Sequence, residues 1–242
     1  MPYDQRGETI VNEMKKHVVI TGAGSGLGAA LAYKYNEQGY HVTLIGRTIK
    51  KLEQVTKTFK KDAFSIYALD VSAFQDVESV FKQIVTDVQP IDILVNNAGV
   101  GHFALTEDLT AEQINQMIDV NLKGTIFCTQ QVLGDMKARN SGSIINVIST
   151  AGVEGKVTES AYCASKFGAR GFTESLIKEL EQTNVQAHGI YMGGMQTPFW
   201  DGILDETVTA GMMDPADIAD IILANTKERS HISVPEVIIK NR

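Results

Sequence analysis

Short apolar runs alternate with longer amphipathic runs along almost the whole chain. The apolar runs have the length of buried strands, and the amphipathic runs have the length of helices. A regular strand–helix order with mostly apolar strands indicates a parallel sheet that helices cover on both faces. This alternation restricts the chain to an α/β fold more strongly than any other feature.

The expected elements follow from these runs. Strands are expected at residues 17–21, 41–46, 63–69, 91–95, 142–149, 185–191 and 231–239, and helices at residues 26–38, 49–61, 74–88, 111–138 (with a break near Asn121), 160–182 and 214–225. Crossovers in parallel sheets are right-handed, which gives the strand order 3-2-1-4-5-6-7. The sequence therefore predicts a doubly wound parallel sheet, the Rossmann fold, with about seven strands.

Length and charge narrow the class of protein. The 242 residues contain no linker-like segment, so we expect one domain over residues 16–242 and a flexible arm at residues 1–15. The net charge of −7 argues against a nucleic-acid partner. No apolar run reaches the roughly 18 residues of a membrane helix, and residues 1–16 do not resemble a secretory signal. Cys128 and Cys163 lack metal-site spacing. We therefore expect a cytoplasmic protein with free thiols and no metal.

A glycine-rich turn separates the first expected strand from the first expected helix. Its spacing, G-x-x-x-G-x-G, differs from G-x-G-x-x-G. Glycines let the backbone approach a pyrophosphate, and the helix N-terminus offers free N–H groups. A tight turn without a ligand is the alternative for this motif alone. The expected dinucleotide contacts in the turn are Gly22, Gly24, Ser25, Gly26, Leu27 and Gly28.

The ends of the next strands supply further expected contacts, because ligands of such sheets bind at the carboxyl edge. Arg47 follows the second strand, where an acidic residue would suit NAD and an arginine suits the 2′-phosphate of NADP. NADP is therefore favoured, and a solvated cation at a helix start is the other interpretation of Arg47. The remaining contacts are Asp70 and Val71 for the adenine and Asn97, Ala98 and Gly99 for the ribose.

Tyr162 and Lys166 stand four residues apart on an expected helix, and Ser149 precedes Tyr162 by 13 residues. Residues i and i+4 share one helix face, so the phenol and the ammonium should point into the same space. A cation beside a phenol lowers the phenol pKa toward the working pH. Such a phenol can exchange a proton with an alcohol oxygen, which, together with a dinucleotide, indicates hydride transfer to a carbonyl.

These motifs together resemble the short-chain dehydrogenase/reductase family, and the likeness extends over nearly the whole chain from about Lys16. The matching elements are TGAGSGLG at Thr21–Gly28, Asp70-Val71, NNAG at Asn96–Gly99, Asn121 within Val-Asn-Leu, Ser149 and YCASK at Tyr162–Lys166. The resemblance implies an NADP-dependent carbonyl reductase.

The resemblance also implies a role for each catalytic position. Tyr162 would be the general acid in reduction or the general base in oxidation. Lys166 would hold the nicotinamide ribose and lower the Tyr162 pKa, and Ser149 would donate a hydrogen bond to the substrate oxygen. Asn121 would kink the long helix and hold a water that links Lys166 to solvent.

The chain departs from the family pattern after the sixth strand. Met192 stands where a proline is usual, while Gly193 and Thr197 keep their places. Methionine restores the N–H and the freedom in φ that proline lacks, so this loop is expected to sit differently. Gly193, Met195 and Thr197 are the expected contacts to the nicotinamide.

The substrate wall is expected to be apolar and to include a short lid near residues 197–213. No arginine is placed to clamp a carboxylate, which favours a small neutral carbonyl or alcohol. A 3-oxoacyl thioester reductase is the alternative within the enzyme class, and a non-catalytic NADP(H)-sensing regulator is the alternative outside it. The expected substrate contacts are His102, Phe103, Val153, Phe199 and Trp200.

The helices at residues 111–138 and 160–182 are long and carry more apolar residues than one sheet face requires. The family commonly pairs these helices across a two-fold axis, so a homodimer or homotetramer is expected. The residues concerned are Ile126, Phe127, Val132, Leu133, Phe167, Phe172 and Leu176.

Overall fold

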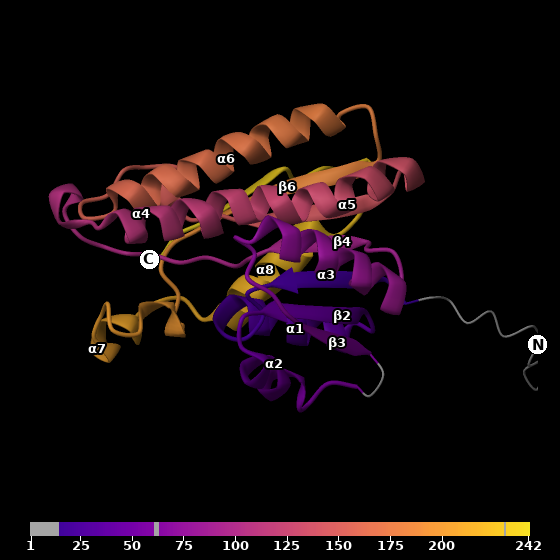
Figure 1. The fold of residues 1–242 in the computed structure, drawn as a ribbon, viewed down its shortest axis with the longest axis horizontal. Coiled ribbons are helices and arrows are strands. Elements are labelled where there is room, and N and C mark those ends of the chain that lie inside the picture. Colours follow the sequence, from indigo (N-terminus) through magenta and orange to yellow (C-terminus); the bar gives the residue numbers. More distant parts are fainter. Residues whose placement is uncertain (1–14, 61–62, 230) are drawn as a thin grey trace, which may run out of the picture.

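Seven parallel strands form one sheet in the order β3-β2-β1-β4-β5-β6-β7, as the sequence predicts (Figure 1). The structure is a computed structural model that describes residues 15–60, 63–229 and 231–242. All but the last residue of the expected arm at residues 1–15 thus lies outside the described residues. The strands are β1 (His17–Thr21), β2 (His41–Gly46), β3 (Phe64–Ala68), β4 (Ile93–Asn96), β5 (Gly142–Val147), β6 (Val185–Met192) and β7 (Glu236–Ile239).

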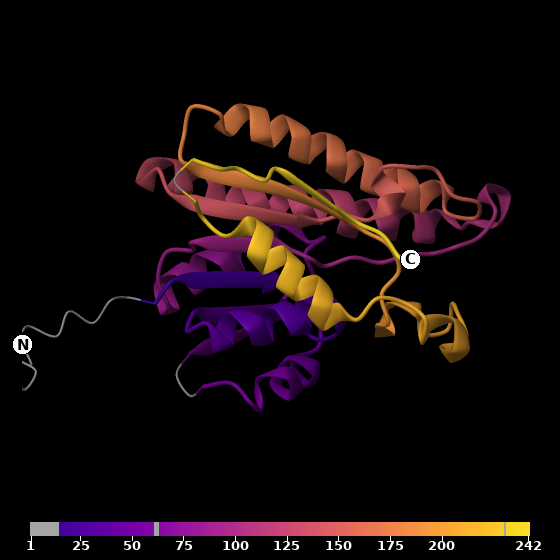
Figure 2. The same ribbon diagram turned by 180° about the vertical axis from the view of Figure 1, so that it is seen from behind.

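Helices cover both faces of this sheet, which makes the fold the expected doubly wound type (Figure 1 and Figure 2). Two separate groups of buried apolar side chains lie on the two faces, one beneath α1, α2 and α8 and one beneath α3, α5 and α6. The helices are α1 (Gly26–Glu37), α2 (Ile49–Thr56), α3 (Phe74–Asp87), α4 (Ala111–Ile118), α5 (Thr125–Arg139), α6 (Ser160–Leu180), α7 (Glu206–Thr209) and α8 (Pro215–Thr226).

Two expected elements are several residues shorter than the sequence suggests. The helix expected at residues 49–61 ends at Thr56, and Phe59 then turns inward to pack edge-on against Phe64. The strand expected at residues 231–239 begins only at Glu236. Pro235 precedes it and has no N–H to donate to a sheet ladder, so regular pairing starts after this residue.

The expected break near Asn121 is present. A π-helical segment, Asp119–Gly124, separates α4 from α5 and contains Asn121. A π-helical turn adds one residue to the helical circuit and is frequent at functional sites. The break therefore turns Asn121 toward the interior, where its side chain is buried.

The segment after β6 forms a loop whose two ends pair with each other. Gln196 donates its backbone N–H to the Met213 carbonyl at 2.9 Å, and Met195 and Met213 form an isolated parallel bridge. The chain between them carries a short 3₁₀ turn, Pro198–Trp200, and the helix α7, neither of which the sequence reasoning placed. Both ribbon views show α7 projecting from the body of the fold.

The two long helices were expected to carry more apolar residues than one sheet face requires. Only some of these residues remain exposed on a single chain. Val132 and Leu176 are almost fully buried in the core of a single chain, and Phe127, Leu133 and Phe172 pack against the same core. Phe167, in contrast, is 43% exposed. Among the described residues, no helix has the length and apolar character needed to cross a membrane.

Candidate active site

The glycine turn between β1 and α1 needs glycine at three of its positions. Gly22 and Gly26 have φ angles of 65° and 52°, in the left-handed region. A Cβ atom at Gly22 would lie 2.8 Å from the Ala98 Cα atom, and one at Gly28 would lie 2.4 Å from the Gly22 carbonyl oxygen. The G-x-x-x-G-x-G spacing, which differs from G-x-G-x-x-G, thus lets the turn pack closely against the ends of β1 and β4.

Asn97 fastens this turn. Its side-chain amide donates to the carbonyl oxygens of Thr21 and Gly22, at 3.0 and 3.2 Å, respectively. The Thr21 hydroxyl accepts in turn from the backbone N–H groups of Asn97 and Ala98, both at 3.0 Å. Asn97 therefore holds the glycine turn in place and also lines the cavity. Its position in the sequence did not reveal the first of these roles.

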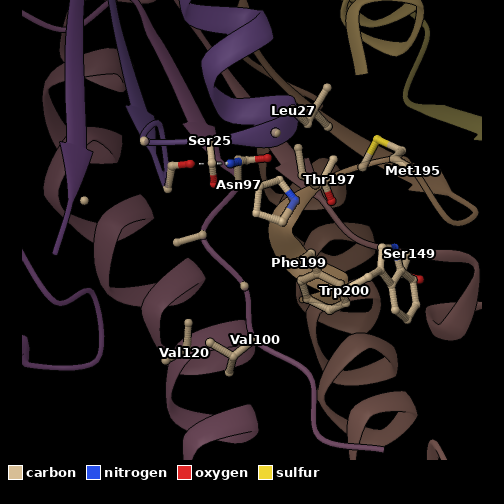
Figure 3. Close-up of a pocket in the computed structure, with 18 of the residues that line it drawn as sticks. Ser25, Leu27, Asn97, Val100, Val120, Ser149, Met195, Thr197, Phe199 and Trp200 are labelled. Atoms are coloured by element: carbon tan, nitrogen blue, oxygen red, sulfur yellow. Dashed lines mark hydrogen bonds between the residues drawn. The ribbon is translucent and has the colours of Figure 1, made fainter. Parts of the chain in front are cut away.

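A cavity of about 430 Å³ runs from the glycine turn to Tyr162. Figure 3 shows Ser25, Leu27 and Asn97 around the turn and Phe199 and Trp200 farther along the cavity. Most of the residues predicted from the sequence line it: Gly22, Gly24, Ser25, Gly26, Leu27, Arg47, Asp70, Val71, Asn97, Ala98, Gly99, Ser149, Tyr162, Lys166, Gly193, Met195, Thr197, Phe199 and Trp200.

Five predicted site residues do not line the cavity: Gly28, His102, Phe103, Asn121 and Val153. Gly28 packs behind the turn. The His102 ring bonds to the Gln116 side chain at 2.9 Å in an exposed position. Val153 is 36% exposed on the loop that follows Ser149. The contacts predicted for His102 and Val153 are therefore absent from the cavity wall in this structure.

Ser149, Tyr162 and Lys166 converge at one end of the cavity. Ser149 follows β5 in an extended conformation, and its hydroxyl accepts from the Ala151 N–H at 3.1 Å. Tyr162 and Lys166 lie one turn apart on α6, both are buried, and the Lys166 Nζ atom is 5.8 Å from the centre of the Tyr162 ring. The predicted sharing of one helix face is confirmed.

The direction of the Tyr162 pKa differs from the expectation. Burial raises it well above its usual range, and a hydrogen bond with Ser149 only partly opposes this effect. Burial also lowers the Lys166 pKa, to about 8. In this structure the Lys166 ammonium donates to the Val147 carbonyl at 3.4 Å, so desolvation outweighs any attraction between the two charged forms.

Asn121 acts through direct hydrogen bonds. Its Nδ2 atom donates to the Val100 carbonyl and to the Ser165 hydroxyl, each at 2.9 Å, and its Oδ1 atom accepts from the Val100 N–H at 2.8 Å. A Cβ atom at Gly99 would lie 3.3 Å from this oxygen and 3.6 Å from the Lys166 Nζ atom. Asn121 thus ties the loop after β4 to α6 right beside Lys166.

The opposite end of the cavity is positively charged. The cations are Arg47, which is exposed, and Lys51, one turn into α2. Burial raises the Asp70 pKa, but hydrogen bonds from Ser72 and the charge of Arg47 outweigh it, and the net pKa is lowered. Asp70 accepts from the Ser72 hydroxyl at 2.7 Å, so its carboxylate also closes the turn after β3.

The loop with the unusual methionine is an extension of β6. Met192 is buried and pairs with Ile239 of β7, which lengthens the strand by one residue beyond the prediction. Gly193 then donates its N–H to the Ile239 carbonyl at 3.0 Å, and Asn241 donates to the Gly194 carbonyl at 3.2 Å. With methionine at this position, the pairing of β6 with β7 reaches the residues that line the cavity.

Aromatic rings surround the catalytic end. Phe103 stacks on Trp200 with ring centres 5.5 Å apart and meets Tyr162 edge-on at 5.3 Å. Phe199 meets Trp200 edge-on at 5.1 Å. Phe103 thus supports the wall from behind. Lys156, Glu159 and Asp201 are further charged residues that line the cavity. Lys51 also lines it, and the sequence reasoning missed this residue because no motif contains it.

Known proteins are similar to this chain in sequence and in fold. A sepiapterin reductase of Chlorobaculum tepidum is 34% identical over 236 residues, which cover 94% of this chain and 96% of that protein. A solved closed form of a serine dehydrogenase with NADP⁺ superimposes with a TM-score of 0.86 at 29% identity, covering 92% of this chain and 93% of the other. An alcohol dehydrogenase from the archaeon Thermococcus sibiricus, complexed with 5-hydroxy-NADP, gives 0.86 at 26% identity, with coverage of 94% and 97%.

The seven-stranded parallel sheet and the turn at its carboxyl edge define an α/β protein of the Rossmann class. The model of the short chain dehydrogenase family matches residues 16–207, and the chain belongs to this oxidoreductase family. The described residues contain no group of three or more side chains that could hold a metal ion.

Proposed function

We propose that this chain is an NADP(H)-dependent reductase or dehydrogenase that acts on a small carbonyl or alcohol. The observation that carries the proposal is the single cavity that joins the glycine turn to Ser149, Tyr162 and Lys166. The NADP complexes of the serine and alcohol dehydrogenases support this choice of cofactor. Arg47 and Lys51 supply the charge that would bind a 2′-phosphate.

The cofactor would supply or accept the hydride when bound. The residues of the chain manage the proton and the developing charge. In the reduction of a carbonyl, Ser149 donates a hydrogen bond to the oxygen, and Tyr162 transfers its phenolic proton to that oxygen as the alcohol forms. Lys166 then stabilises the phenolate that remains. Burial keeps the Tyr162 phenol neutral before the reaction. The Lys166 ammonium therefore stabilises a phenolate only after the phenol has given up its proton.

We also propose that residues 16–242 act as one domain and that residues 197–213 form a lid. The paired ends of this segment, at Met195 and Met213, support a hinge, and Phe199 and Trp200 on it already face the cavity. The aromatic wall suits a small carbonyl compound better than the long acyl chain of a 3-oxoacyl thioester. A regulator without activity would not need the combination of Ser149, Tyr162 and Lys166.

The direct test is consumption of NADPH with a panel of small ketones, dicarbonyls, and a short 3-oxoacyl thioester. The proposal expects turnover of at least one small carbonyl and poor turnover of the thioester. Tight NADPH binding without turnover of any carbonyl would favour the regulator. Faster turnover of the thioester than of every small carbonyl would favour the alternative enzyme.

A further inference from the structure

The catalytic end of the cavity carries a carboxylate that the roles above do not use. Glu159 lines the same cavity as Ser149 and Tyr162. Its carboxylate accepts no hydrogen bond from any other residue within the described parts of the chain. Burial is the main cause of the raised Tyr162 pKa, and the negative charge of Glu159 contributes to it as well. The Glu159 carboxylate is therefore electrostatically close to the phenol that is proposed to transfer a proton.

The backbone at Glu159 is held on both sides. Thr158 accepts at its carbonyl from the Ala104 N–H at 2.9 Å, and the Ser160 hydroxyl lies 2.8 Å from the Thr106 hydroxyl. These two bonds connect the loop before α6 to the loop after β4. Glu159 itself accepts at its carbonyl from the Cys163 N–H, within the first turn of α6. The position of Glu159 is therefore fixed before a substrate enters.

Thr158 adopts a conformation that favours glycine. Its φ angle is 65°, and a β-branched residue in the left-handed region is strained. Such strain persists only where the surrounding structure enforces it, and it clusters at functional sites. Here the hydrogen bonds that flank Glu159 enforce it. Glu159, the residue that follows this strained position, lines the cavity.

No cation at this end forms an ion pair with Glu159 among the described residues. Burial raises the Glu159 pKa, and the charge of Lys156 opposes this rise only in part. The Lys156 ammonium donates to the Thr150 hydroxyl at 2.9 Å, and no ion pair between Lys156 and Glu159 occurs among the described residues. Asp201, the third charged lining residue near the lid, is a second carboxylate and is exposed. A substrate that carries a carboxylate would meet two like charges here, and the two lysines at this end, Lys156 and Lys166, already donate hydrogen bonds to other groups.

We propose that Glu159 is a specificity-determining residue that binds a hydrogen-bond-donating cation, an ammonium or a protonated amino group, on the substrate. The substrate class is thereby refined from a small carbonyl to an amino carbonyl or amino alcohol, a refinement that rests on the proposed function. An unpartnered carboxylate in the cavity that holds Ser149 and Tyr162 favours a cationic substituent on the carbon next to the one that carries the reacting oxygen. A neutral substituent of the same size would bind less tightly, and an anionic one least tightly of all.

Three alcohols with one carbon skeleton test this charge preference: 1-aminopropan-2-ol, propane-1,2-diol and lactate. Trp200 is the only tryptophan of the chain and lines the cavity, so its fluorescence can report binding. Titrations are done on the full chain alone and with NADPH, with which an alcohol cannot react. The ammonium compound is expected to bind about tenfold more tightly than the diol, because hydrogen bonds to charged groups are strong.

The variant Glu159→Gln keeps the size of the side chain and removes its charge. It should abolish the tenfold preference and leave the affinity for the diol nearly unchanged. Glu154→Gln is the matched control, because it makes the same charge change on the same loop at an exposed residue that does not line the cavity. Equal affinities of the unmodified chain for all three alcohols would overturn the proposal. So would a preference that survives in Glu159→Gln, or one that Glu154→Gln abolishes equally.

The corresponding carbonyls, aminoacetone, hydroxyacetone and pyruvate, are then offered with NADPH. If none is reduced while the titrations show the Glu159-dependent preference, the proposed activity on these carbonyls fails and the ligand preference stands. If aminoacetone is reduced with the highest kcat/KM, and Glu159→Gln lowers that value about tenfold relative to hydroxyacetone, both are supported.

Discussion

The Lys166 Nζ atom lies 5.8 Å from the centre of the Tyr162 ring, and both side chains are buried one helical turn apart on α6. Burial favours the neutral form of each group, so it raises the Tyr162 pKa and lowers the Lys166 pKa. Two groups whose pKa values are displaced in this way, inside a cavity with a hydrogen-bonding serine, are typical of a catalytic site.

The Tyr162→Phe variant tests the proton transfer. It removes only the hydroxyl and retains the edge-on contact with Phe103, so the melting temperature should stay close to that of the unmodified protein. If Tyr162 is the general acid, kcat should fall by roughly 10²–10⁴. Steady-state kinetics on the best carbonyl of the panel measures this. Near-normal turnover in a folded variant would remove Tyr162 from the mechanism.

The lowered Lys166 pKa predicts a pH-dependent cost to stability. Between about pH 8 and pH 10.5 the unfolded chain binds more protons at this residue than the folded chain, so the free energy of unfolding rises with pH in that window. Lys166→Met removes the cost. At pH 7 it should raise the free energy of unfolding by roughly 2–3 kcal/mol while abolishing activity.

Urea unfolding of both proteins at pH 7 and at pH 10 checks this prediction. The advantage of Lys166→Met should shrink toward zero at the higher pH, where the unmodified lysine is neutral in the folded chain. A difference of the same size at both pH values would show that the lysine charge is not responsible.

Arg47 should decide the preference for the cofactor. Paired hydrogen bonds from its guanidinium to a 2′-phosphate would favour NADPH over NADH by roughly 10- to 100-fold in kcat/KM. Arg47→Ala should remove most of this preference by raising KM for NADPH and leave NADH nearly unaffected. Lys50→Ala is a suitable control, since Lys50 is an exposed neighbouring cation that does not line the cavity. Equal kcat/KM values for the two cofactors in the unmodified protein would contradict this role of Arg47.

Glycine-to-alanine exchanges should have opposite effects at two positions. Gly28→Ala would place a Cβ atom 2.4 Å from the Gly22 carbonyl oxygen and should destabilise the fold by about 2–4 kcal/mol. Gly134, inside α5, has nothing within 4 Å of its Cβ position, so Gly134→Ala should stabilise by about 0.5–1 kcal/mol. Thermal unfolding measures both. A stable Gly28→Ala protein would mean that the turn can relax.

Assembly is predicted from one exposed aromatic residue. Phe167 is 43% exposed on α6, so we expect it to be covered in a homodimer or homotetramer at micromolar concentration. Phe167→Lys should dissociate the assembly, whereas Val85→Lys, at a similarly exposed position on α3, should not. Light scattering gives the masses, and a monomeric unmodified protein would disprove the prediction.

The sequence predicts the sheet order and most of the cavity because both depend on local signals. Apolar periodicity defines the strands, and the residues after each strand, such as Arg47 and Asn97, meet at one edge by topology alone. The hydrogen bonds between two loops that hold the backbone around Glu159 have no such signal. The pKa directions of Tyr162 and Lys166 likewise depend on burial, which spacing along a helix does not reveal.

Asn97 and Thr21 have a consequence for the thermodynamics of ligand binding. Their four hydrogen bonds lock the end of β4 to the end of β1 in the free chain. The ends of β1 and β4 are therefore already at their final separation when a ligand arrives. Little conformational entropy is lost there on binding, so heat-capacity and entropy changes measured by calorimetry should originate mainly from the 197–213 segment.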